Sequence, residues 1–413
     1  MLSEESLELI VQDHLAELEW VSGHGPDFAP GSGERDTWND IVLRGRLRNA
    51  VRNLNPGVPE EYLDQAIGEV ITPKSQSAIA ENRRIHQILV EGYRGIEYID
   101  HEGNIQNPTI VFLSSQPHMN DYLSLNQVTV ANLDGERRFD VVCYVNGMPL
   151  AFIELKKTGA NTSIEGAHNQ LQTYVKEFGM AFRFANIVIP SDDLSAKYGT
   201  PFTPWNHFAP WNVNEDGRPV PSDNMVVAGE PVTQLDLLLD GLFNVERFGQ
   251  LYSDFTAFDD TAEGLVMRIA KPHQYFAVTK AVGSTITAAR GDKRAGVIWH
   301  TTGAGKSMEM ELYTAKIMRR SEMLSPTVIV LNDRTELDEQ LFETFNRSTI
   351  LPEAPRNIES RAELRELLSQ KTSGGIYFST LQKFGLNGQG KLRETEHPLL
   401  SDRSNIVVIV DEA

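Results

Sequence analysis

Cysteine is almost absent from this chain of 413 residues, because Cys143 is the only one. A single thiol excludes an intrachain disulfide and indicates a reducing compartment, so we expect a cytoplasmic protein. Long apolar runs are also missing, since no stretch approaches the roughly 20 residues of a transmembrane helix. The first residues, Met-Leu-Ser-Glu-Glu, lack the basic-then-apolar order of a signal peptide, so we expect no association with a membrane.

Positive charge is scarce as well. The chain has 38 Lys and Arg residues against 57 Asp and Glu residues, a net charge of −19. This excess of acidic residues argues against non-specific nucleic-acid binding through the whole surface. It leaves room for a locally basic groove, or for a second polypeptide that supplies most of the contact with DNA. No internal repeat is evident, and the length predicts two or three domains.

In the part of the chain before about residue 261, the sequence pattern predicts several helices followed by a mixed sheet. Helices are expected at residues 2–18, 43–54, 59–71, 79–91 and 164–178, and strands at residues 96–100, 109–113 and 127–130 and in a hairpin at residues 137–157. This order favours an α/β/α nuclease-like layer over a long parallel sheet. Residues 234–258 are predicted to be helical and to lead into the next unit.

From about residue 261 the pattern changes to repeated strand–helix units. Strands are expected at residues 296–300, 327–332, 375–378 and 406–410, and helices at residues 306–320 and 335–345. Short apolar strands separated by helices indicate a parallel, doubly wound sheet.

The hairpin at residues 137–157 has an unusual charge pattern. An Asn-Gly pair at residues 146–147 predicts the turn, because both residues tolerate positive φ. Asp140 begins the first strand, and Glu154 and Lys156 lie two positions apart on the second, hence on one face. Two carboxylates and a lysine are costly to bury on an apolar hairpin unless they pair with one another or hold a metal.

The length of the turn decides whether the two carboxylates meet. A two-residue turn would place Asp140 opposite Ile153, with Glu154 on the far face. A three-residue turn that includes Met148 would pair Asp140 with Glu154, and such turns are common. Pro149 cannot donate a ladder hydrogen bond in any case, so we predict the three-residue turn.

The spacing of these charged residues suits a Mg²⁺-dependent phosphodiesterase. Asp140 and Glu154, with the carbonyl that follows Glu154, would hold one or two Mg²⁺ ions, which activate a bound water. Lys156 would position that water or neutralise the pentacovalent phosphate. Gln170 and Tyr174, four apart on the next helix, would bind phosphate or orient the metal site. From the three charged residues alone, a salt-bridged sheet edge is an equally good interpretation.

A phosphate-binding loop is predicted at residues 300–307, between a strand and a helix. Lys306 would reach the β and γ phosphates, and Ser307 would ligate Mg²⁺. His300 stands where the general pattern has glycine, which leaves the part that contacts phosphate intact. The predicted contacts with the nucleotide come from Thr302, Gly303, Ala304, Gly305, Lys306 and Ser307.

An apolar strand at residues 406–410 ends in an acid pair and supports this prediction. Asp411 suits the surroundings of the Mg²⁺, and Glu412 suits activation of the attacking water. Gln274 precedes the loop and could read an adenine edge. A lone match to a phosphate loop can be a helix-capping turn, but the strand before, the helix after and the acid pair argue against that here.

Together, these residues resemble the motor–nuclease (R) subunit of type I restriction enzymes over essentially the whole chain. Residues 146–156 with Asp140 look like that family's nuclease hairpin, although Phe139 stands where the family often has proline. The phosphate loop of the family usually begins with His, as here, and Gln274 falls where the family has its adenine-contacting glutamine. Other segments similar to family motifs are Gln170-x-x-x-Tyr174, residues 208–211, 333–340 and 379–384, and Asp411-Glu-Ala413, which looks like the start of a DEAH box.

The resemblance implies a fold for each part of the chain. Residues 1–230 would form a PD-(D/E)xK-type endonuclease domain with an α/β/α core, and residues 231–260 a helical connector. Residues 261–413 would form the first RecA-like, doubly wound parallel-sheet domain of a superfamily 2 helicase motor, incomplete at its C-terminus. We therefore expect a fragment of a longer subunit that hydrolyses ATP poorly, since the second motor domain would close the ATP site.

The resemblance also implies ATP-driven DNA translocation and Mg²⁺-dependent double-strand cleavage, in a complex with methyltransferase (M) and specificity (S) subunits. Target choice would then lie outside this chain, which fits its acidic composition. Two other interpretations stay open. One is a helicase–nuclease of the same superfamily that acts in DNA repair without a methyltransferase, and the other is a DNA-binding scaffold with a degenerate metal site.

Overall fold

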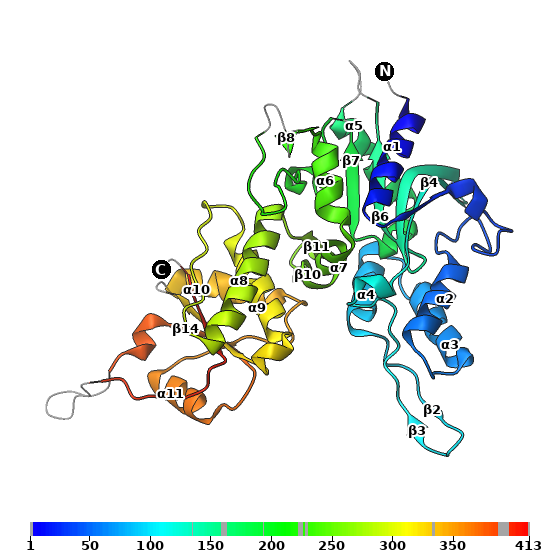
Figure 1. The fold of residues 1–413 in the computed structure, drawn as a ribbon. Helices are drawn as coiled ribbons and strands as arrows, with labels where there is room; N and C mark the ends of the chain where they lie inside the picture. The colour runs from blue at the N-terminus through cyan, green and yellow to red at the C-terminus, as the bar shows by residue number, and fades with distance from the viewer. Residues whose placement is uncertain are drawn as a thin grey trace. The chain divides into compact units, whose positions relative to one another are not determined.

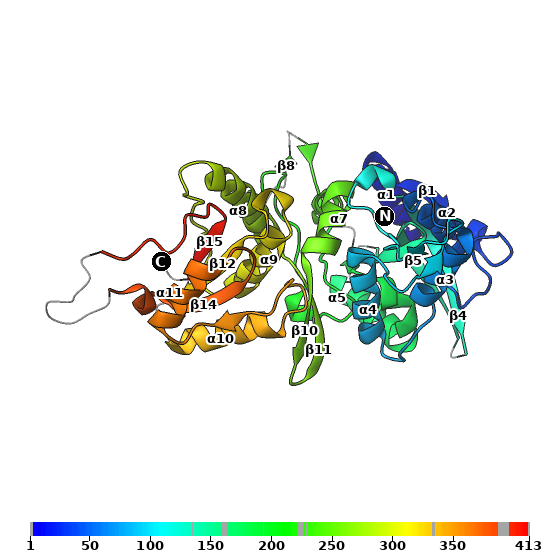
Figure 2. The same cartoon turned by 90° about the horizontal axis from the view of Figure 1, so that it is seen from below.

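The computed structural model describes residues 3–133, 135–157, 163–192, 194–221, 226–227, 230–332, 335–386 and 396–411. The chain divides into two compact units, Met1–Thr256 with Leu265–Ile269, and Ala257–Gly264 with Ala270–Ala413. Each unit has its own multistranded sheet and its own helices, so the chain is a mixed α/β protein (Figures 1 and 2).

A five-stranded mixed sheet forms the centre of the first unit. Its strand order is β1-β4-β5-β6-β7. β4, β5 and β6 are antiparallel, whereas the outer strands β1 and β7 run parallel to their neighbours. The strands are β1 (Val21–His24), β4 (Tyr122–Asn132), β5 (Gly135–Val145), β6 (Met148–Leu155) and β7 (Ile187–Ser191). The predicted mixed sheet with a central hairpin is confirmed.

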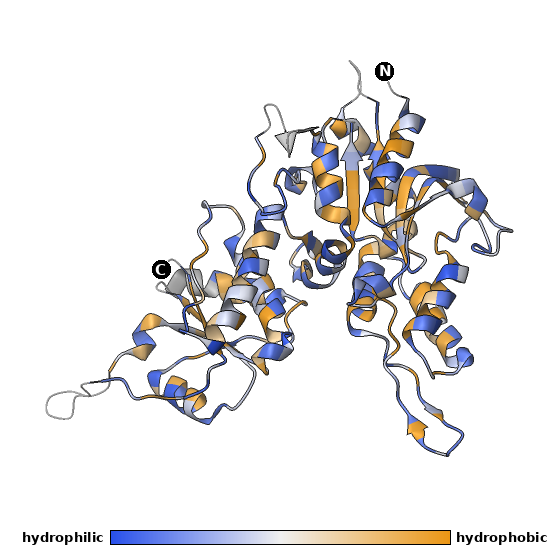
Figure 3. Cartoon of the chain, in the orientation of Figure 1, coloured by the Kyte–Doolittle hydropathy of each residue, from blue (hydrophilic) through white to orange (hydrophobic). Residues whose placement is uncertain are grey.

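Helices cover both faces of this sheet. Every residue of β6 is buried, which requires cover on both sides of the strand. Helix α1 (Glu4–Glu17) contacts β1, β4, β5 and β6, and α5 (Ile164–Glu177) contacts β6 and β7. Phe152 of β6 and Tyr174 of α5 share one apolar core. Figure 3 shows mainly apolar central strands and both apolar and polar residues along α1, as expected for helices packed on a sheet.

The first unit contains further helices and two short hairpins. They are helices α2 (Arg44–Leu54), α3 (Glu60–Ile71), α4 (Ala78–Glu91), α6 (Gln234–Phe243) and α7 (Val245–Asp254), and the hairpins β2 (Tyr98–Ile99) with β3 (Ile105–Gln106) and β8 (Val226–Val227) with β9 (Glu230–Pro231). Short 3-10 helices lie at Gly25–Phe28, Pro117–Met119, Gly179–Phe184 and Trp205–His207.

Two predicted segments differ in extent. Residues 234–258 form two helices followed by a strand, because Asn244 ends α6 and its side chain caps α7. The strand predicted at residues 109–113 is reduced to one bridge between Ile110 and Tyr93.

The turn of the β5–β6 hairpin also differs from the prediction. Val145 pairs with Met148, so the turn has two residues and the predicted three-residue turn is wrong. Asn146 and Gly147 both have positive φ, 51° and 77°. Such a pair matches the twist of the flanking strands, and this favours the short turn.

The extra residue of the hairpin lies in a β-bulge instead. The register shifts next to Tyr144, and beyond the shift Val141 pairs with Ile153. Continuing that register by one residue places Asp140 opposite Glu154. The predicted pairing of the two carboxylates therefore holds, but the cause is a bulge and not a longer turn.

The second unit contains a four-stranded parallel sheet with the order β13-β14-β12-β15. Its strands are β12 (Thr327–Asn332), β13 (Arg356–Asn357), β14 (Ile376–Thr380) and β15 (Ile406–Val410), and the hairpin β10 (Thr256–Thr261) with β11 (Gly264–Ile269) precedes them in the chain. Its helices are α8 (Pro272–Arg290), α9 (Lys306–Met318), α10 (Thr335–Arg347) and α11 (Arg361–Gln370), with 3-10 turns at Ser321–Met323 and Leu381–Phe384. No helix in the described part of the chain has both the length and the apolar character needed to cross a bilayer.

Residues 296–300, predicted as a strand, do not form one. Val297 and Trp299 are each 92% exposed, and no ladder includes them. β15 lies at the edge of the sheet, and its Val408 and Val410 are about half exposed. An apolar run becomes a strand only where another strand pairs with it, and no described residue pairs with this one.

Candidate functional site

The β5–β6 hairpin brings two carboxylates together inside the first unit. Glu154 is only 1% exposed. Asp140 accepts a 2.7 Å hydrogen bond from the backbone N–H of Leu155, next to Glu154. Burial raises the pKa of both carboxyl groups, and the negative charge of Asp140 helps to raise that of Glu154 to about 8. The two acids thus occupy one poorly hydrated site.

Lys156 partly neutralises this site. Its Nζ lies 3.0 Å from Oε1 of Glu154 and donates to the carbonyl of Leu155 at 3.3 Å. The pKa of Glu154 is nevertheless raised, so one ammonium does not offset the burial of Glu154 together with the negative charge of Asp140. β6 also has a neighbouring strand on each side. The alternative of a sheet edge is therefore wrong, although the salt bridge that it named, between Lys156 and Glu154, is present.

The donor set of this site fits a hard divalent cation. Two carboxylates and the Leu155 carbonyl offer only oxygen ligands, which Mg²⁺ prefers. A divalent cation would also neutralise the excess negative charge of Asp140 and Glu154. The residues predicted to hold Mg²⁺ are thus chemically suited to it.

The predicted pair on α5 lies beside the same carboxylates. Gln170 donates through Nε2 to the hydroxyl of Tyr174. Tyr174 is buried, and its pKa is raised first by burial and then by the negative charge of Glu154 and Asp140. The structure therefore brings all five predicted residues of this site together.

One residue near this site was not predicted. Glu8 of α1 is 2% exposed, and its Oε2 accepts a 3.3 Å hydrogen bond from Nδ2 of Asn126. Burial and then the charge of Asp140 raise the pKa of Glu8 to about 7. The sequence carries a signal for it, because Glu8 lies between Leu7 and Val11 on the apolar side of an amphipathic helix.

In the second unit, the predicted phosphate loop leads directly into helix α9. Gly303 and Gly305 have φ of 83° and 88°, a conformation that favours glycine, and Gly305 is the N-cap of the helix. Lys306 and Ser307 are the first two residues of α9, so their backbone N–H groups lie at the positive end of the helix dipole. This is the arrangement that binds phosphate groups.

Gln274 contacts this loop. Its Nε2 donates to the carbonyls of Ala304 at 3.4 Å and Gly305 at 3.3 Å, and its Oε1 accepts from the N–H of Lys271. The predicted contact with adenine is not tested by these bonds. They place the amide against the backbone of the phosphate loop.

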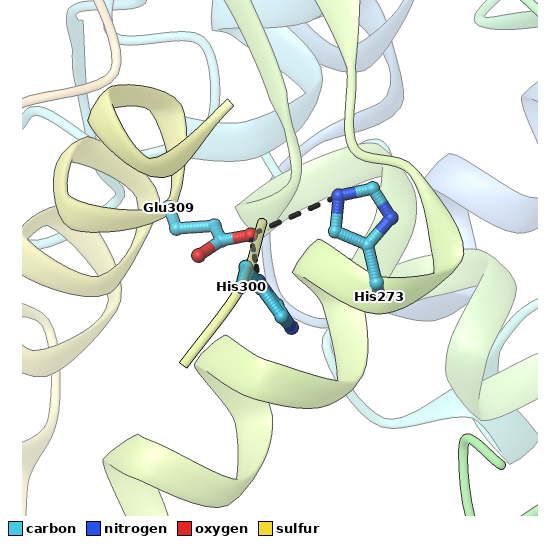
Figure 4. A group of neighbouring side chains, drawn as sticks. All are labelled: His273, His300 and Glu309. Atoms are coloured by element: carbon cyan, nitrogen blue, oxygen red, sulfur yellow. Dashed lines mark hydrogen bonds and ion pairs between the residues drawn. The ribbon is translucent and has the colours of Figure 1, made fainter. Parts of the chain in front are cut away.

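Two histidines and a glutamate brace the same loop (Figure 4). Nδ1 of His300 lies 2.7 Å from Oε1 of the buried Glu309, and Nε2 of His273 lies 3.8 Å from the same oxygen. Nε2 of His273 also donates to the carbonyl of Ala304 at 2.9 Å. His300, which stands where the general phosphate-loop pattern has glycine, thus pairs with a buried carboxylate.

The acid pair after β15 is described only in part. The N–H of Asp411 donates to the carbonyl of Leu331 at 3.0 Å, which extends the β12–β15 ladder. No hydrogen bond in the described part of the chain joins Asp411 to residues 300–307. Glu412 lies outside the described residues.

Comparison with known proteins gives matches to both parts of the chain. Residues 1–207 match the family described as type I restriction enzyme R protein N terminus. Residues 273–413 match the family described as SWI2/SNF2 ATPase.

Relatives similar to the chain carry consistent names. The endonuclease subunit of the type I restriction enzyme HindI from Haemophilus influenzae is 34% identical over 100% of this chain and 39% of its own length. The putative type I restriction enzyme MjaIXP endonuclease subunit of Methanocaldococcus jannaschii is 33% identical over 97% of this chain and 38% of its own length. The chain thus spans about two fifths of the length of these relatives.

Proposed function

This chain belongs to the family of type I restriction enzyme endonuclease subunits, and we propose that its first unit cuts DNA while its second unit is driven by ATP. The observation that carries the proposal is the partly buried Asp140 held at the buried Glu154, with Lys156 beside them. Such a pair has no packing role on the central strands β5 and β6, since removing two carboxylates from water opposes folding.

For the first unit we propose a PD-(D/E)xK-type nuclease domain over residues 1–230. Asp140, Glu154 and the Leu155 carbonyl would hold Mg²⁺, which when bound would supply an activated water and neutralise charge on the phosphate. Lys156, freed from its pair with Glu154, would hold the attacking water or the phosphate oxygen.

The pair on α5 has a positioning role in this proposal. The hydroxyl of Tyr174 is held by Gln170 and lies near the carboxylates. It would orient them or bind the scissile phosphate as a hydrogen-bond donor. This is the simplest chemical reason for a buried, polar Gln–Tyr contact at the site.

For the second unit, after a connector at residues 231–260, we propose the first RecA-like domain of a superfamily 2 motor over residues 261–413. Backbone N–H groups of residues 302–305 would cradle the phosphates of ATP, Lys306 would bind the β and γ phosphates, and Ser307 would face Mg²⁺. Asp411 and Glu412 would support the metal and activate water. The match to the SWI2/SNF2 ATPase family supports this proposal.

The partners proposed are double-stranded DNA and the methyltransferase and specificity subunits of the same complex. The names of the relatives support this choice over a repair helicase–nuclease without a methyltransferase. A net charge of −19 supports it too, because most of the DNA contact would then come from other subunits.

The test is the Lys156→Ala variant in the complete enzyme with its partner subunits. We expect DNA cleavage to fall at least about 100-fold while ATP hydrolysis stays within about twofold, because the substitution touches only the cutting site. Lys157→Ala, which changes the adjacent exposed lysine, is the matched control. Cleavage that persists in Lys156→Ala would show that the site is assigned wrongly.

A further inference from the structure

Three side chains with metal-binding atoms converge beside the phosphate loop of the second unit. His273, His300 and Glu309 form the only group of at least three histidine, cysteine or acidic residues in the described part of the chain whose ligand atoms all lie within 4.8 Å of one another. The two histidines approach the same carboxylate from different segments, as Figure 4 shows. Their nitrogens and the carboxylate oxygen therefore share one small volume.

The separations between these atoms suit a small transition-metal ion. Ligands bonded to Zn²⁺ at about 2.0–2.1 Å in a tetrahedron lie roughly 3.3 Å from one another. Oε1 of Glu309 lies 2.7 Å from Nδ1 of His300 and 3.8 Å from Nε2 of His273, on either side of that value. The two imidazole rings are nearly perpendicular, at 87°, so they do not stack on each other. Small side-chain shifts would thus admit an ion.

The donor set distinguishes this site from the two magnesium positions proposed above. Two imidazole nitrogens and one carboxylate suit Zn²⁺, with a water in the fourth position, whereas Mg²⁺ prefers oxygen ligands alone. The side chain of Glu309 is 3% exposed, and those of His273 and His300 are 36% and 24% exposed. An ion can therefore reach the buried carboxylate from the side of the histidines.

The hydrogen bonds of the loop allow an ion to bind. Nε2 of His273 donates to the carbonyl of Ala304 at 2.9 Å, so this nitrogen can ligate a metal only if its proton moves to Nδ1. The carbonyl of Ala304 then keeps a second donor, because Nε2 of Gln274 lies 3.4 Å from it. Metal binding does not leave this carbonyl unpaired, which would otherwise oppose it.

We propose that His273, His300 and Glu309 form a binding site for Zn²⁺ or a similar transition-metal ion. His273 belongs to α8, His300 begins the phosphate loop, and Glu309 lies in α9. A bound ion joins these three segments of the second unit and restricts the movement of the loop between them. The site does not depend on the proposed nuclease centre or on bound nucleotide.

The first test measures Zn²⁺ affinity on the whole chain without nucleotide, by competition with a coloured chelator in a large excess of Mg²⁺. We expect wild type to bind one Zn²⁺ ion that Mg²⁺ does not displace. His273→Gln keeps an N–H donor for the Ala304 carbonyl, and His300→Asn keeps one for Glu309, so each can preserve the hydrogen bonds without the imidazole. Each should bind Zn²⁺ at least about 100-fold more weakly.

Two control variants separate this site from other places where Zn²⁺ could bind. His101→Gln removes a histidine whose side chain is 91% exposed and should bind Zn²⁺ as wild type does. Asp140→Asn changes the nuclease centre and should also leave this Zn²⁺ in place. Loss of the ion in Asp140→Asn would place it at the β5–β6 hairpin and overturn the inference, whatever the nuclease centre does.

X-ray absorption at the zinc edge gives a second readout that does not depend on the folding of any variant. Zinc bound to wild type should show the scattering of two imidazole rings, which the oxygen ligands of the nuclease centre cannot produce. Zinc without imidazole ligands would contradict the inference, and so would a wild-type chain that binds no Zn²⁺ in excess Mg²⁺. If His273→Gln and His300→Asn melt at lower temperatures but bind Zn²⁺ as wild type does, the three residues only brace the loop and the inference is overturned.

Discussion

Burial makes the charge state of Glu154 unusual for a carboxyl group. Its pKa rises from 4.5 to about 8, because burial and the charge of Asp140 disfavour the ionised form more than Lys156 favours it. The folded protein therefore holds a proton on Glu154 that the unfolded chain has already lost. Between these two pKa values, stability without metal should fall as the pH rises.

The variant Glu154→Gln tests this charge state. Relative to wild type, it should become more stable as the pH rises from about 5 to about 8, by roughly 1–3 kcal/mol at the upper end. Denaturant unfolding in the presence of a chelator measures the difference at each pH. Glu165→Gln, a solvent-facing change on α5, serves as control. A stability difference for Glu154→Gln that does not depend on pH would contradict the raised pKa.

At the residue scale, residue type and spacing predict which side chains form the site, but they do not predict which distant side chains lie next to it. Asp140, Glu154, Lys156, Gln170 and Tyr174 were identified from residue type and spacing, and the structure brings them together. The nearness of Glu8 could not be predicted, because α1 and β5 meet only through the tertiary fold and more than 100 residues separate them in the chain.

The β5–β6 hairpin is the element that sets the position of these residues. Its two-residue turn depends on Gly147, where an added Cβ would lie 2.4 Å from the carbonyl oxygen of Leu43 and 2.7 Å from the N–H nitrogen of Leu47. Both are backbone atoms, so a side chain has no room there. Gly147 also has positive φ, which adds strain for any other residue.

Gly147→Ala should therefore destabilise the first unit by roughly 2–4 kcal/mol, since it combines a backbone clash with an unfavourable φ. Thermal or denaturant unfolding measures the change. Gly68→Ala in helix α3, where an added Cβ meets nothing within 4 Å, should instead stabilise the protein by about 0.5–1 kcal/mol. Equal effects of the two substitutions would contradict this account of the turn.

At the element scale, local pattern and tertiary pairing have to agree for a prediction to hold. The Asn-Gly turn was located correctly, but its length was not, because a bulge near Tyr144 depends on packing that sequence spacing does not reveal. The run at residues 296–300 has the composition of a strand but has no partner strand in the described part of the chain. The sequence pattern does not predict helix α8, because its three threonines and its glycine have low helix propensity.

At the scale of the whole molecule, each unit has its own apolar core. Phe152 and Tyr174 belong to a cluster within the first unit, and Ile329 and Tyr377 to a cluster within the second. The order of motifs along the chain predicted a nuclease part before a motor part, because both motifs are local in sequence. Proximity between distant segments inside each unit required the structure.

Separate cores predict that substitutions in the two sites act independently. Lys306→Ala should remove most of the rise in melting temperature caused by ATP or a non-hydrolysable analogue, because the β and γ phosphates lose their cation. The rise caused by Mn²⁺ alone should stay within about a fifth of the wild-type value, since the nuclease ligands lie in the other unit. A parallel loss of both responses in Lys306→Ala would contradict independence.

The central claim is that the β5–β6 hairpin holds the metal of a nuclease. Anomalous diffraction from crystals of the chain soaked in Mn²⁺ tests it most directly. The predicted result is a peak about 2.0–2.3 Å from carboxylate oxygens of Asp140 and Glu154 and from the Leu155 carbonyl, with Lys156 moved off Glu154. A structure in which Mn²⁺ binds elsewhere while Lys156 stays paired with Glu154 would contradict the claim.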